Sequence, residues 1–508
     1  MSQVKKNIVC SDRVSDFYDG KSVFMTGASG YLGVIILETL LRCCPGIRSV
    51  YILMREKKGV SPERRKDAIF KKNIFSWLRE KDPDALKKVK VVAGDASLPD
   101  MGMCSRDLER VTSEVSIVFH IAACISFMKP LRYMLSQNSR PMDYVIDLCR
   151  KLKKVDVLVY TSTAYSNSNR KEEIEEQIYR LPFPAQKFLN ELNNGNEDSL
   201  NKLASQCLPK WPNHYTFSKC LAENVILDKA SDIPTVIVRP SIIVSCWKGI
   251  LPGYIEEGSG MVDLGIAIGK GFVRVIPGDP NVRMDIIPVD VVANTHIVAA
   301  WSVASNRSQS PMIVNCTTSD ICDTSLSKYT QTLFNMSLKH PLPKAFQSQG
   351  HSLIIQKHFL LYTLLSLIEH YAPAYFIDVL LSLSGKKPRL VKLYRFYDKA
   401  MDSLKHFMTT EYVFRNENLN CLSEQMTGED KELLYTDLTG FTVDKMAESI
   451  PRGAPFYQWD IDTKRIAERK KVTHMRYMLT TSVKAVFLAT IFSLLYLIIS
   501  RVLVKLIV

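Results

Sequence analysis

Residues 21–43 read KSVFMTGASGYLGVIILETLLRC, and this stretch decides the fold. A short apolar run, a glycine-rich turn and a long apolar stretch follow one another, which predicts a strand, a loop and a buried helix. Gly27, Gly30 and Gly33 lack a Cβ, so the backbone can turn tightly, approach a pyrophosphate and pack helix against strand. Anionic phosphates would meet the free N–H groups of the helix N-terminus. The segment predicts nucleotide binding, with a plain tight turn as the alternative.

A second apolar run, SVYILMR, ends at Arg55, about twenty residues after the last glycine, where an NAD-binding unit usually has an acidic residue for the ribose. Here Arg55, Lys57 and Lys58 lie close together in the sequence. Their positive charge suits a 2′-phosphate and favours NADP over NAD. Glu56 stands among them, and a solvated turn is the alternative.

Two further strand ends follow in VKVVAGDAS and VSIVFHIAA. Asp95 in the first is placed to accept a hydrogen bond from an adenine amino group. His120 in the second is interpreted as a packed strand-end residue, because no second histidine stands at metal-ligand spacing.

The chemistry is expected after the next strand, VDVLVYTSTAYSN, which ends in hydroxyl residues that include Ser162 and Thr163. Downstream, NHYTFSKCLAENVI places Tyr215 and Lys219 four residues apart, on one face of a helix. A nearby ammonium would lower the pKa of the phenol and let it serve as a proton donor. Alone, this spacing also fits a solvated helix face; after a nucleotide fold and a hydroxyl-tipped strand it indicates a catalytic group.

Composition limits the remaining possibilities. The chain has 508 residues, 46% of them hydrophobic, and a net charge of +14, which favours anionic partners. No nucleic acid partner is expected, because the basic residues are spread along the chain and no nucleic-acid-binding signature occurs. The twelve cysteines show no C-x-x-C pair and predict reduced thiols without bridges or a metal. The first twenty residues lack a secretory signal, so we expect the catalytic body to face the cytosol.

The end of the chain predicts a membrane anchor. Sixteen uncharged residues, 485–500, would cover about 24 Å as a helix, so spanning about 30 Å of hydrocarbon requires Lys484 or Arg501 to extend toward the interface. The preceding basic stretch, 464–476, would stay on the cytosolic side. An amphipathic surface helix is the alternative. Residues 353–384 form a second apolar stretch, which predicts either domain core or an acyl tunnel or membrane-docking element.

Several segments together resemble the alcohol-forming fatty acyl-CoA reductases of animals, especially the insect type, within the extended short-chain dehydrogenase/reductases. They are, in order, TGASGYLG, YILMREKKG, VVAGDASLPDMGM, VSIVFHIAA, VYTSTAYSN, HYTFSKCLAE, VIVRPSII and MDIIPVDVVAN. The similarity continues into LYRFYDKAMDSLKHFMTTEYVFRNENL and ELLYTDLTGFTVDKM, which look like the family's helical C-terminal domain. The resemblance covers roughly residues 18 to 460.

The resemblance implies a role for individual residues. Tyr215 matches the proton donor, Lys219 the residue that holds the nicotinamide ribose, and Thr163 the strand-end hydroxyl, with Ser162 as the next candidate. The predicted cofactor-binding residues are Thr26, Gly27, Ser29, Gly30, Tyr31, Leu32, Gly33, Arg55, Lys58, Asp95, Ala96, Ala122 and Lys219.

Three segments depart from the family pattern. Asn138 is followed by Ser139 to Met142, where the family usually has N-V-x-G-T, and Pro141 changes the wall near the nicotinamide. Met128 and Lys129 replace a usual acidic pair. P-G-Y-I-E-E at 252–257 replaces P-G-W-I-D-N, which would alter the acyl entrance. The polar insertion 170–212 is expected to cover the site as a lid or rim.

The expected fold is α/β: a Rossmann-like doubly wound parallel sheet with a C-terminal helical domain and a membrane tail. The expected domains are an NADPH-binding reductase domain at 15–345, a helical domain at 346–462, and a basic linker with a transmembrane tail at 463–508. The implied activity is reduction of long-chain acyl-CoA to a primary alcohol with two NADPH, without a metal. The alternatives are a reductase of a sterol or nucleotide-sugar, or a silent NADP-binding lipid or scaffold protein. The expected location is the endoplasmic reticulum membrane, with peroxisome or lipid droplet as alternatives. The expected partners are the acyl-CoA substrate and membrane lipid. The oligomeric state is not predicted.

Overall fold

The computed structural model describes residues 13–258, 260–306, 311–342, 345, 353–455 and 463–507. The chain forms two compact units. The first combines residues up to Ile255 with Asp285–Asp323 and Tyr412–Thr442, and the second combines Glu256–Met284, Thr324–Glu411 and Val443–Val508. Cys10 and the expected domain boundaries near 346 and 462 lie outside the described residues.

The first unit is built on a seven-stranded sheet in the order β10-β6-β5-β4-β1-β2-β3, in which every pairing is parallel. Its strands are mostly buried, as expected for a parallel sheet covered on both faces. The winding reverses at β1, which pairs with β2 on one side and β4 on the other. The strands are β1 Ser22–Thr26, β2 Ser49–Met54, β3 Val89–Ala93, β4 Ile117–His120, β5 Val157–Thr161, β6 Thr235–Pro240 and β10 Met312–Cys316.

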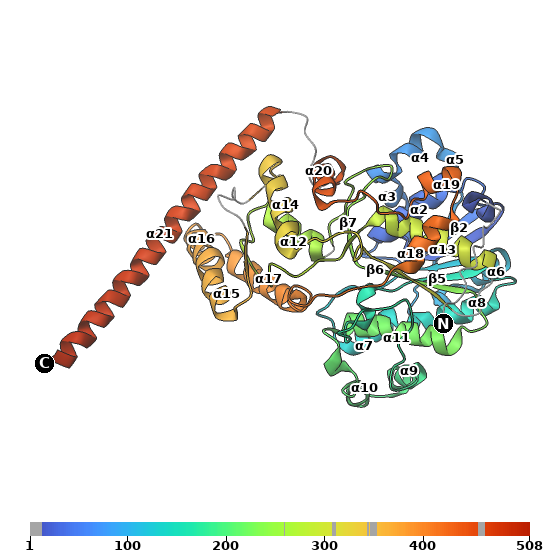
Figure 1. The fold of residues 1–508 in the computed structure, drawn as a ribbon, viewed down its shortest axis with the longest axis horizontal. Coiled ribbons are helices and arrows are strands. Elements are labelled where there is room, and N and C mark those ends of the chain that lie inside the picture. Colours follow the sequence, from blue (N-terminus) through green and yellow to red (C-terminus); the bar gives the residue numbers. More distant parts are fainter. Residues whose placement is uncertain are drawn as a thin grey trace. The chain divides into compact units, whose positions relative to one another are not determined.

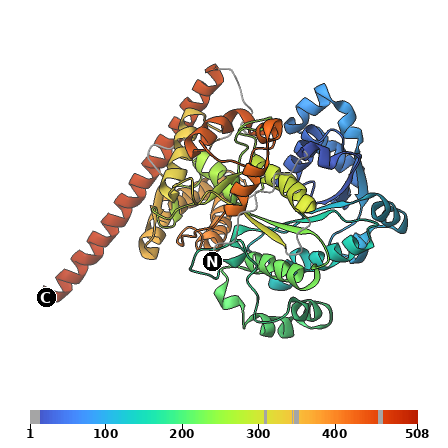
Figure 2. The ribbon, with the colours of Figure 1, turned by 45° about the vertical axis from the view of Figure 1, so that its right-hand side comes forward.

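Helices cover both faces of this sheet (Figures 1 and 2). The α2 and α13 helices pack together on one face, whereas α7, α8 and α11 pack together on the other. The helices are α1 Val14–Tyr18, α2 Tyr31–Cys43, α3 Pro62–Phe70, α4 Ser76–Lys81, α5 Pro83–Lys87, α6 Ser105–Glu114, α7 Leu131–Asn138, α8 Arg140–Lys151, α9 Ala185–Asn194, α10 Glu197–Ala204, α11 His214–Lys229, α13 Val289–Asn306, α18 Glu417–Gln425 and α19 Gly428–Leu433. A short parallel pair, β7 Ile242–Val244 and β9 Ile286–Pro288, completes the unit.

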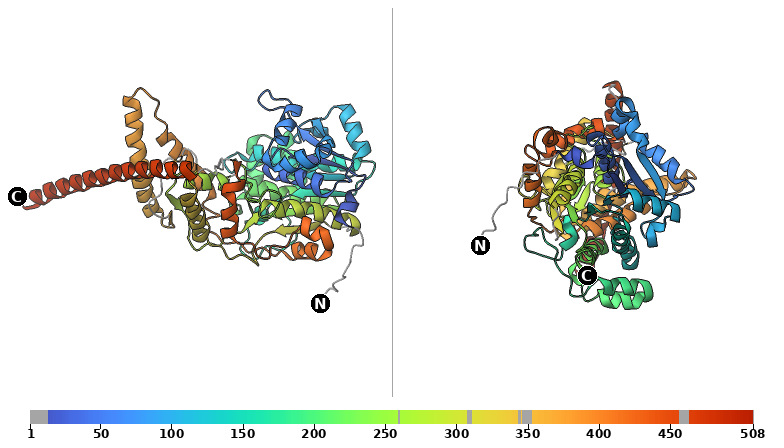
Figure 3. Two further views of the ribbon diagram at one scale, coloured as in Figure 1. Left: turned by 90° about the horizontal axis from the view of Figure 1, so that it is seen from above. Right: turned by 90° about the vertical axis from the view of Figure 1, so that its right-hand side faces the viewer.

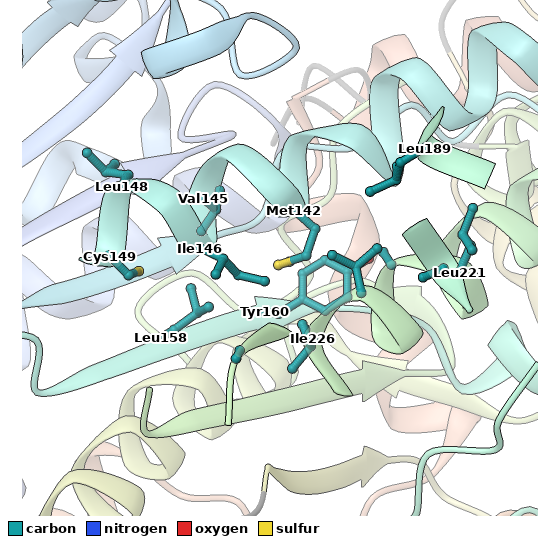
Figure 4. Packing of buried hydrophobic residues seen from close by; sticks show 14 of the residues in the cluster. Met142, Val145, Ile146, Leu148, Cys149, Leu158, Tyr160, Leu189, Leu221 and Ile226 are labelled. Carbon is teal, nitrogen blue, oxygen red and sulfur yellow. The ribbon is translucent and has the colours of Figure 1, made fainter. Parts of the chain in front are cut away.

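The core on the α8 and α11 face fixes the strand that carries the hydroxyl residues. Met142 and Ile146 of α8 meet Leu158 and Tyr160 of β5, with Leu221 of α11 beside them (Figure 4). All five side chains are fully buried. The expected doubly wound sheet is therefore confirmed, and its core holds β5 and α11 in a fixed relation.

The two units interleave along the chain, unlike the contiguous domains expected from the sequence. Residues 412–442 belong to the first unit because they join its framework directly. The Phe414 backbone forms a bridge with Ile174, the hydroxyl of Tyr412 donates to the Ser168 carbonyl at 3.0 Å, and Asn294 donates to the Tyr435 carbonyl at 2.9 Å.

The second unit is mainly helical. Its strands, β8 Val275–Pro277 and β11 Ile354–Gln356, form a parallel pair. Its helices are α12 Gly260–Gly269, α14 Leu326–Lys339, α15 Phe359–Ser366, the π-helical turn η5 Leu367–Tyr371, α16 Ala372–Leu383, α17 Leu390–Leu404, α20 Val443–Gly453 and α21 Thr463–Ile507. The α21 helix is one continuous rod (Figure 3).

Among the described residues, one helical stretch, Phe359–Leu383, is long and apolar enough to cross a membrane by length and composition. The predicted tail forms a helix within α21, and Lys484 directly precedes its uncharged run. Its side chain is buried, and its ammonium pairs with Glu369 of η5. An ion pair inside the unit therefore holds Lys484.

Candidate active site

The glycine loop joins β1 to α2. Gly27 has a φ of 77°, and a Cβ there would lie 2.6 Å from the backbone nitrogen of Ala122. A Cβ on Gly33 would lie 2.2 Å from the carbonyl oxygen of Gly27. Gly30 caps the N-terminus of α2, and a Cβ there would meet its nearest atom at an ordinary 3.4 Å. Close packing therefore requires glycine at 27 and 33, whereas Gly30 leaves the helix N-terminus open to an anion.

Thr26 and His120 tie the ends of β1 and β4 together. The Thr26 hydroxyl oxygen accepts hydrogen bonds from two backbone N–H groups after β4, one of them that of Ala122 at 3.2 Å. Its own proton is thus directed to Nδ1 of His120, 2.8 Å away. Burial, helped by the charge of Lys219, lowers the pKa of His120 to about 3. His120 is a neutral, packed strand-end residue that stacks on Tyr160.

A cationic corner lies between β2, α3 and the glycine loop. Arg55, at the end of β2, pairs with Asp95 at 3.1 Å and has a side chain that is 56% exposed. Arg65 of α3 donates to the Arg55 carbonyl oxygen at 2.5 Å and to the hydroxyl of Ser29 at 3.0 Å. Burial, and then the charge of Arg55, lower the pKa of Arg65, so the two guanidinium groups lie close together. Lys58 lies in an exposed turn with a φ of 53°.

Sequence reasoning missed Arg65. The available signal was the start of α3, where Ser61 caps the helix, Pro62 occupies its first turn, and two arginines follow. The structure turns the second of these arginines toward the glycine loop.

Asp95, which follows β3, is already engaged inside the protein. One carboxylate oxygen accepts from the backbone N–H and hydroxyl of Ser97, at 3.0 and 2.8 Å, and the other accepts from Arg55. Burial raises the pKa of Asp95, but these hydrogen bonds outweigh it and leave the pKa below its ordinary value. The ionised carboxylate therefore positions Arg55, while its expected contact to adenine stays a prediction. The neighbouring Ala96 packs against the core.

Tyr215 and Thr163 meet at the carboxyl end of β5. Thr163 accepts from the backbone N–H of Tyr165 at 3.3 Å, and its side chain hydrogen-bonds the Tyr215 hydroxyl. Burial raises the pKa of Tyr215 above its ordinary value, and the hydrogen bond with Thr163 offsets this only in part. The expected lowering by Lys219 is thus not observed in the protein alone. The phenol is protonated at neutral pH and can donate.

Lys219 lies one helical turn beyond Tyr215 and is 2% exposed. Its ammonium donates to the Thr161 carbonyl at 2.7 Å and lies 4.8 Å from the centre of the Tyr160 ring. Burial lowers the pKa of Lys219 to about 7, while the charge of Glu223 opposes the shift. The side chain can therefore exchange a proton near neutral pH.

Ser162 belongs to a buried ion-pair network. Its hydroxyl donates to Glu223 at 2.5 Å, and Glu223 pairs with Arg239 at 2.6 Å, both with fully buried side chains. Arg239 also donates to the carbonyl oxygens of Glu175 and Gln177 in the polar insertion. Of these two hydroxyl residues, Thr163 is the one that hydrogen-bonds Tyr215. In the sequence, the signal for this network was one charged residue in each of two apolar segments, Glu223 in CLAENVI and Arg239 in VIVRP.

Asn138 fixes the loop after β4 to α11. Its amide accepts from the Cys124 N–H at 2.7 Å and donates to the Cys124 carbonyl and to the hydroxyl of Ser218. Ser139 adds a hydrogen bond to the Ser218 carbonyl at 2.7 Å. Pro141 lies in the first turn of α8, where its missing N–H is tolerated. The unusual segment 139–142 thus keeps an ordered wall behind Tyr215.

Apolar side chains border the phenol. The Phe127 ring lies 5.6 Å from that of Tyr215, and Ile125 and Met128 in the same loop are about half exposed. On the glycine-loop side, Leu32 is buried, and the hydroxyl of Tyr31 lies 2.9 Å from the carbonyl of Tyr254 in the altered P-G-Y-I-E-E segment.

Comparison with known proteins gives the family. Residues 25–296 and 369–459 match two family profiles, each described as male sterility protein. Fatty acyl-CoA reductase 1 of Xenopus laevis is 35% identical, and that of Homo sapiens 33% identical, over 84% of this chain and 82% of each relative. The fold is shared with the terminal R domain of the myxalamid pathway (TM-score 0.54, 17% identity, 85% of this chain and 89% of that one). It is also shared with a reductase domain of a Mycobacterium tuberculosis non-ribosomal peptide synthetase (TM-score 0.55, 15% identity, 87% and 96%). The chain is an oxidoreductase with an NAD(P)-binding domain and belongs to the fatty acyl-CoA reductase family.

Proposed function

We propose that this protein reduces long-chain acyl-CoA to a primary alcohol with two NADPH and releases CoA. The observation that supports this most directly is the hydrogen bond between Thr163 and the phenol of Tyr215 at the carboxyl end of β5, where the Lys219 ammonium donates to the Thr161 carbonyl. A phenol that stays protonated, held by a hydroxyl partner, is suited to protonate a carbonyl oxygen as it is reduced.

The loop and the cationic corner fit a phosphorylated dinucleotide. Gly27 and Gly33 stand where a Cβ would collide with backbone, and Gly30 leaves the α2 N-terminus accessible to a pyrophosphate. Arg55 and Arg65 place two guanidinium groups where an acidic residue would otherwise bond the ribose hydroxyls. Two clustered positive charges favour a 2′-phosphate, and hence NADPH over NADH.

When bound, NADPH supplies a hydride to the acyl carbonyl carbon. Tyr215 donates its proton to the carbonyl oxygen, and the hydroxyl of Thr163 orients that oxygen. The hemithioacetal formed in this way loses CoA thiolate as its C–S bond breaks and its hydroxyl proton passes to the Tyr215 phenolate, which gives an aldehyde. The same residues then serve the second reduction, after which the phenol must be reprotonated. Lys219, which can exchange a proton near neutral pH, is suited to restore it.

The test is NADPH oxidation by the purified full-length protein with palmitoyl-CoA, with the alcohol and free CoA quantified. The expected result is two NADPH oxidised for each alcohol formed and each CoA released. Tyr215→Phe is the control, since it removes only the donated proton. An aldehyde as the final product would contradict the second reduction. No NADPH oxidation by the folded wild-type protein would contradict the proposed reaction.

We further propose that α21 attaches the protein to the endoplasmic reticulum membrane with the catalytic residues on the cytosolic side. Support comes from the uncharged run at 485–500 and from the basic stretch that precedes it. NADPH and acyl-CoA would then both reach the site from the cytosol.

A further inference from the structure

The helical stretch Phe359–Leu383 in the second unit has an inverted polarity. One stripe, whose members recur every four residues, is buried and mostly polar, and it consists of Ser366, His370, Ala374 and Asp378. The exposed stripe is apolar and consists of Leu360, Leu364, Leu367, Tyr375, Val379 and Leu383. A helix on a water-exposed surface has the opposite arrangement, with its apolar stripe turned inward.

Hydrogen bonds inside the unit fix this orientation. Nε2 of His370 accepts from the backbone N–H groups of Arg274 and Val275, at 3.0 and 3.2 Å. The carboxylate of Asp378 accepts from three successive backbone N–H groups at the start of α17, at 2.9 to 3.0 Å. Turning the helix to hide its leucines would leave these buried polar groups without partners, at a large cost in free energy. The apolar stripe is therefore held outward.

The exposure is extensive. Leu360 is 82% exposed and Leu383 is 80% exposed, and they stand near opposite ends of the stretch. Large contiguous apolar patches are rare on soluble monomers and mark interaction surfaces. The stretch cannot be a lone spanning helix, because its other stripe is polar and bonded to protein. It is instead suited to lie with one side in an apolar medium.

Positive charge borders the apolar stripe. The α16–α17 loop and the outer side of α17 carry exposed basic residues, which are Lys386, Lys387, Arg389, Lys392, Arg395 and Lys399. Leu393 and Phe396, 46% and 60% exposed, alternate with them. Of the two acidic residues of α17, Asp398 accepts from the hydroxyl of Tyr371, and Asp402 is exposed in the last turns of the helix. Mixed basic and apolar residues beside an apolar helix face match the interface of a membrane with anionic head groups.

We propose that Phe359–Leu383 and the basic side of α17 together form a docking face that inserts into one leaflet of an anionic lipid bilayer. The leucine stripe enters the acyl region by about 5–10 Å, and the lysines and arginines bind head-group phosphates. The α21 helix packs against α16, and Lys484 pairs with Glu369, so the docking face and the proposed tail anchor belong to the same unit (Figure 1). The inference does not depend on the reaction proposed above.

The test places a photoreactive benzoylphenylalanine at position 364, or separately at 379, in the full-length protein on vesicles of phosphatidylcholine with phosphatidylserine. Lys328, an exposed residue of α14 in the same unit, is the matched control position. Lipid adducts at 364 and 379, and none at 328, are expected. Because the crosslink reports the surroundings of one side chain, the result is independent of whether α21 spans the bilayer.

The charge component is tested by Lys386→Gln, Lys387→Gln and Lys392→Gln combined, which should lower the lipid-adduct yield about fivefold or more on these vesicles. On vesicles of phosphatidylcholine alone, the wild type should give the same low lipid-adduct yield as the triple variant gives on the anionic vesicles. Crosslinks from 364 to a second copy of the chain, or no adduct at 364 and 379, would overturn the docking face. An unchanged yield in the triple variant would overturn its preference for anionic lipid.

Discussion

Replacing Arg65 by alanine should weaken NADPH far more than NADH. The Arg65 guanidinium is oriented by bonds to the Arg55 carbonyl and to Ser29, so it loses little freedom when it binds a 2′-phosphate. A hydrogen bond between charged groups contributes about 1.5–3 kcal/mol, which corresponds to about 10- to 150-fold in NADPH affinity. NADH lacks the phosphate and should lose only about threefold, through the freed Ser29. Arg55→Ala should have a smaller effect, because that side chain is exposed and already paired with Asp95.

The assay is fluorescence titration of the detergent-solubilised full-length protein with each nucleotide. Arg64→Ala is the matched control, since Arg64 is the preceding residue of α3, carries the same charge and is exposed. A general loss of positive potential would weaken NADPH equally in both variants, whereas a bound phosphate singles out Arg65. Equal losses of NADPH and NADH in Arg65→Ala, or equal effects of the two substitutions, would refute the reasoning.

Four further outcomes are expected. Tyr215→Phe should lower turnover by about 10² or more with an unchanged NADPH dissociation constant, measured by titration and steady-state kinetics; full turnover would exclude Tyr215 as the acid. Glu223→Gln leaves a buried guanidinium uncompensated and should lower the free energy of unfolding by about 3 kcal/mol in urea titrations, whereas Glu429→Gln on the surface should change it by less than about 1 kcal/mol. Burial lowers the pKa of Lys219 to about 7, so its buried charge destabilises the folded protein fully below pH 7, and this penalty disappears as the pH rises toward the pKa of the unfolded chain. The free energy of unfolding of the wild type should therefore rise relative to that of Lys219→Met between pH 7 and 10. A constant difference between the two would contradict this. A chain that ends at residue 484 should become extractable by carbonate yet stay active in detergent; loss of activity would place the tail in the acyl site.

The central sheet was predictable because each strand and its loop carry local signals. The β1 run, its three glycines and the apolar α2 sequence suffice to predict that unit, and the structure places all three glycines as expected. Tyr215 and Lys219 were predictable for the same reason, since four residues on a helix fix their common face. The interleaving of the two units was not, because the bonds that bring residues 412–442 into the first unit join positions 141 to 244 residues apart.

At the site, the sequence does not show in which direction a given side chain points. Ser162 and Thr163 are adjacent hydroxyl residues directly after β5, and their side chains bond different partners, Glu223 and Tyr215. The sequence indicates that one of them serves the site, but only the position of Glu223 shows that Ser162 is already used. The direction of the Arg65 side chain was also not predictable from the sequence. It depends on the orientation of α3 after its N-cap, Ser61.

The orientation of the docking-face helix was likewise not predictable from the sequence. In the sequence, Ser366, His370 and Asp378 look like scattered interruptions of an apolar stretch, which fits a domain core as well as a membrane element. Their spacing of four, or twice four, puts them on one stripe, but a stripe of polar residues is normally assigned to solvent. The structure reverses that assignment, because backbone N–H groups of Arg274 and Val275, where β8 begins, and of the start of α17 donate to acceptors on this stripe. The demand for buried hydrogen bonds decides which side of the helix faces the protein, and it leaves the leucines exposed on the side that we propose docks to lipid.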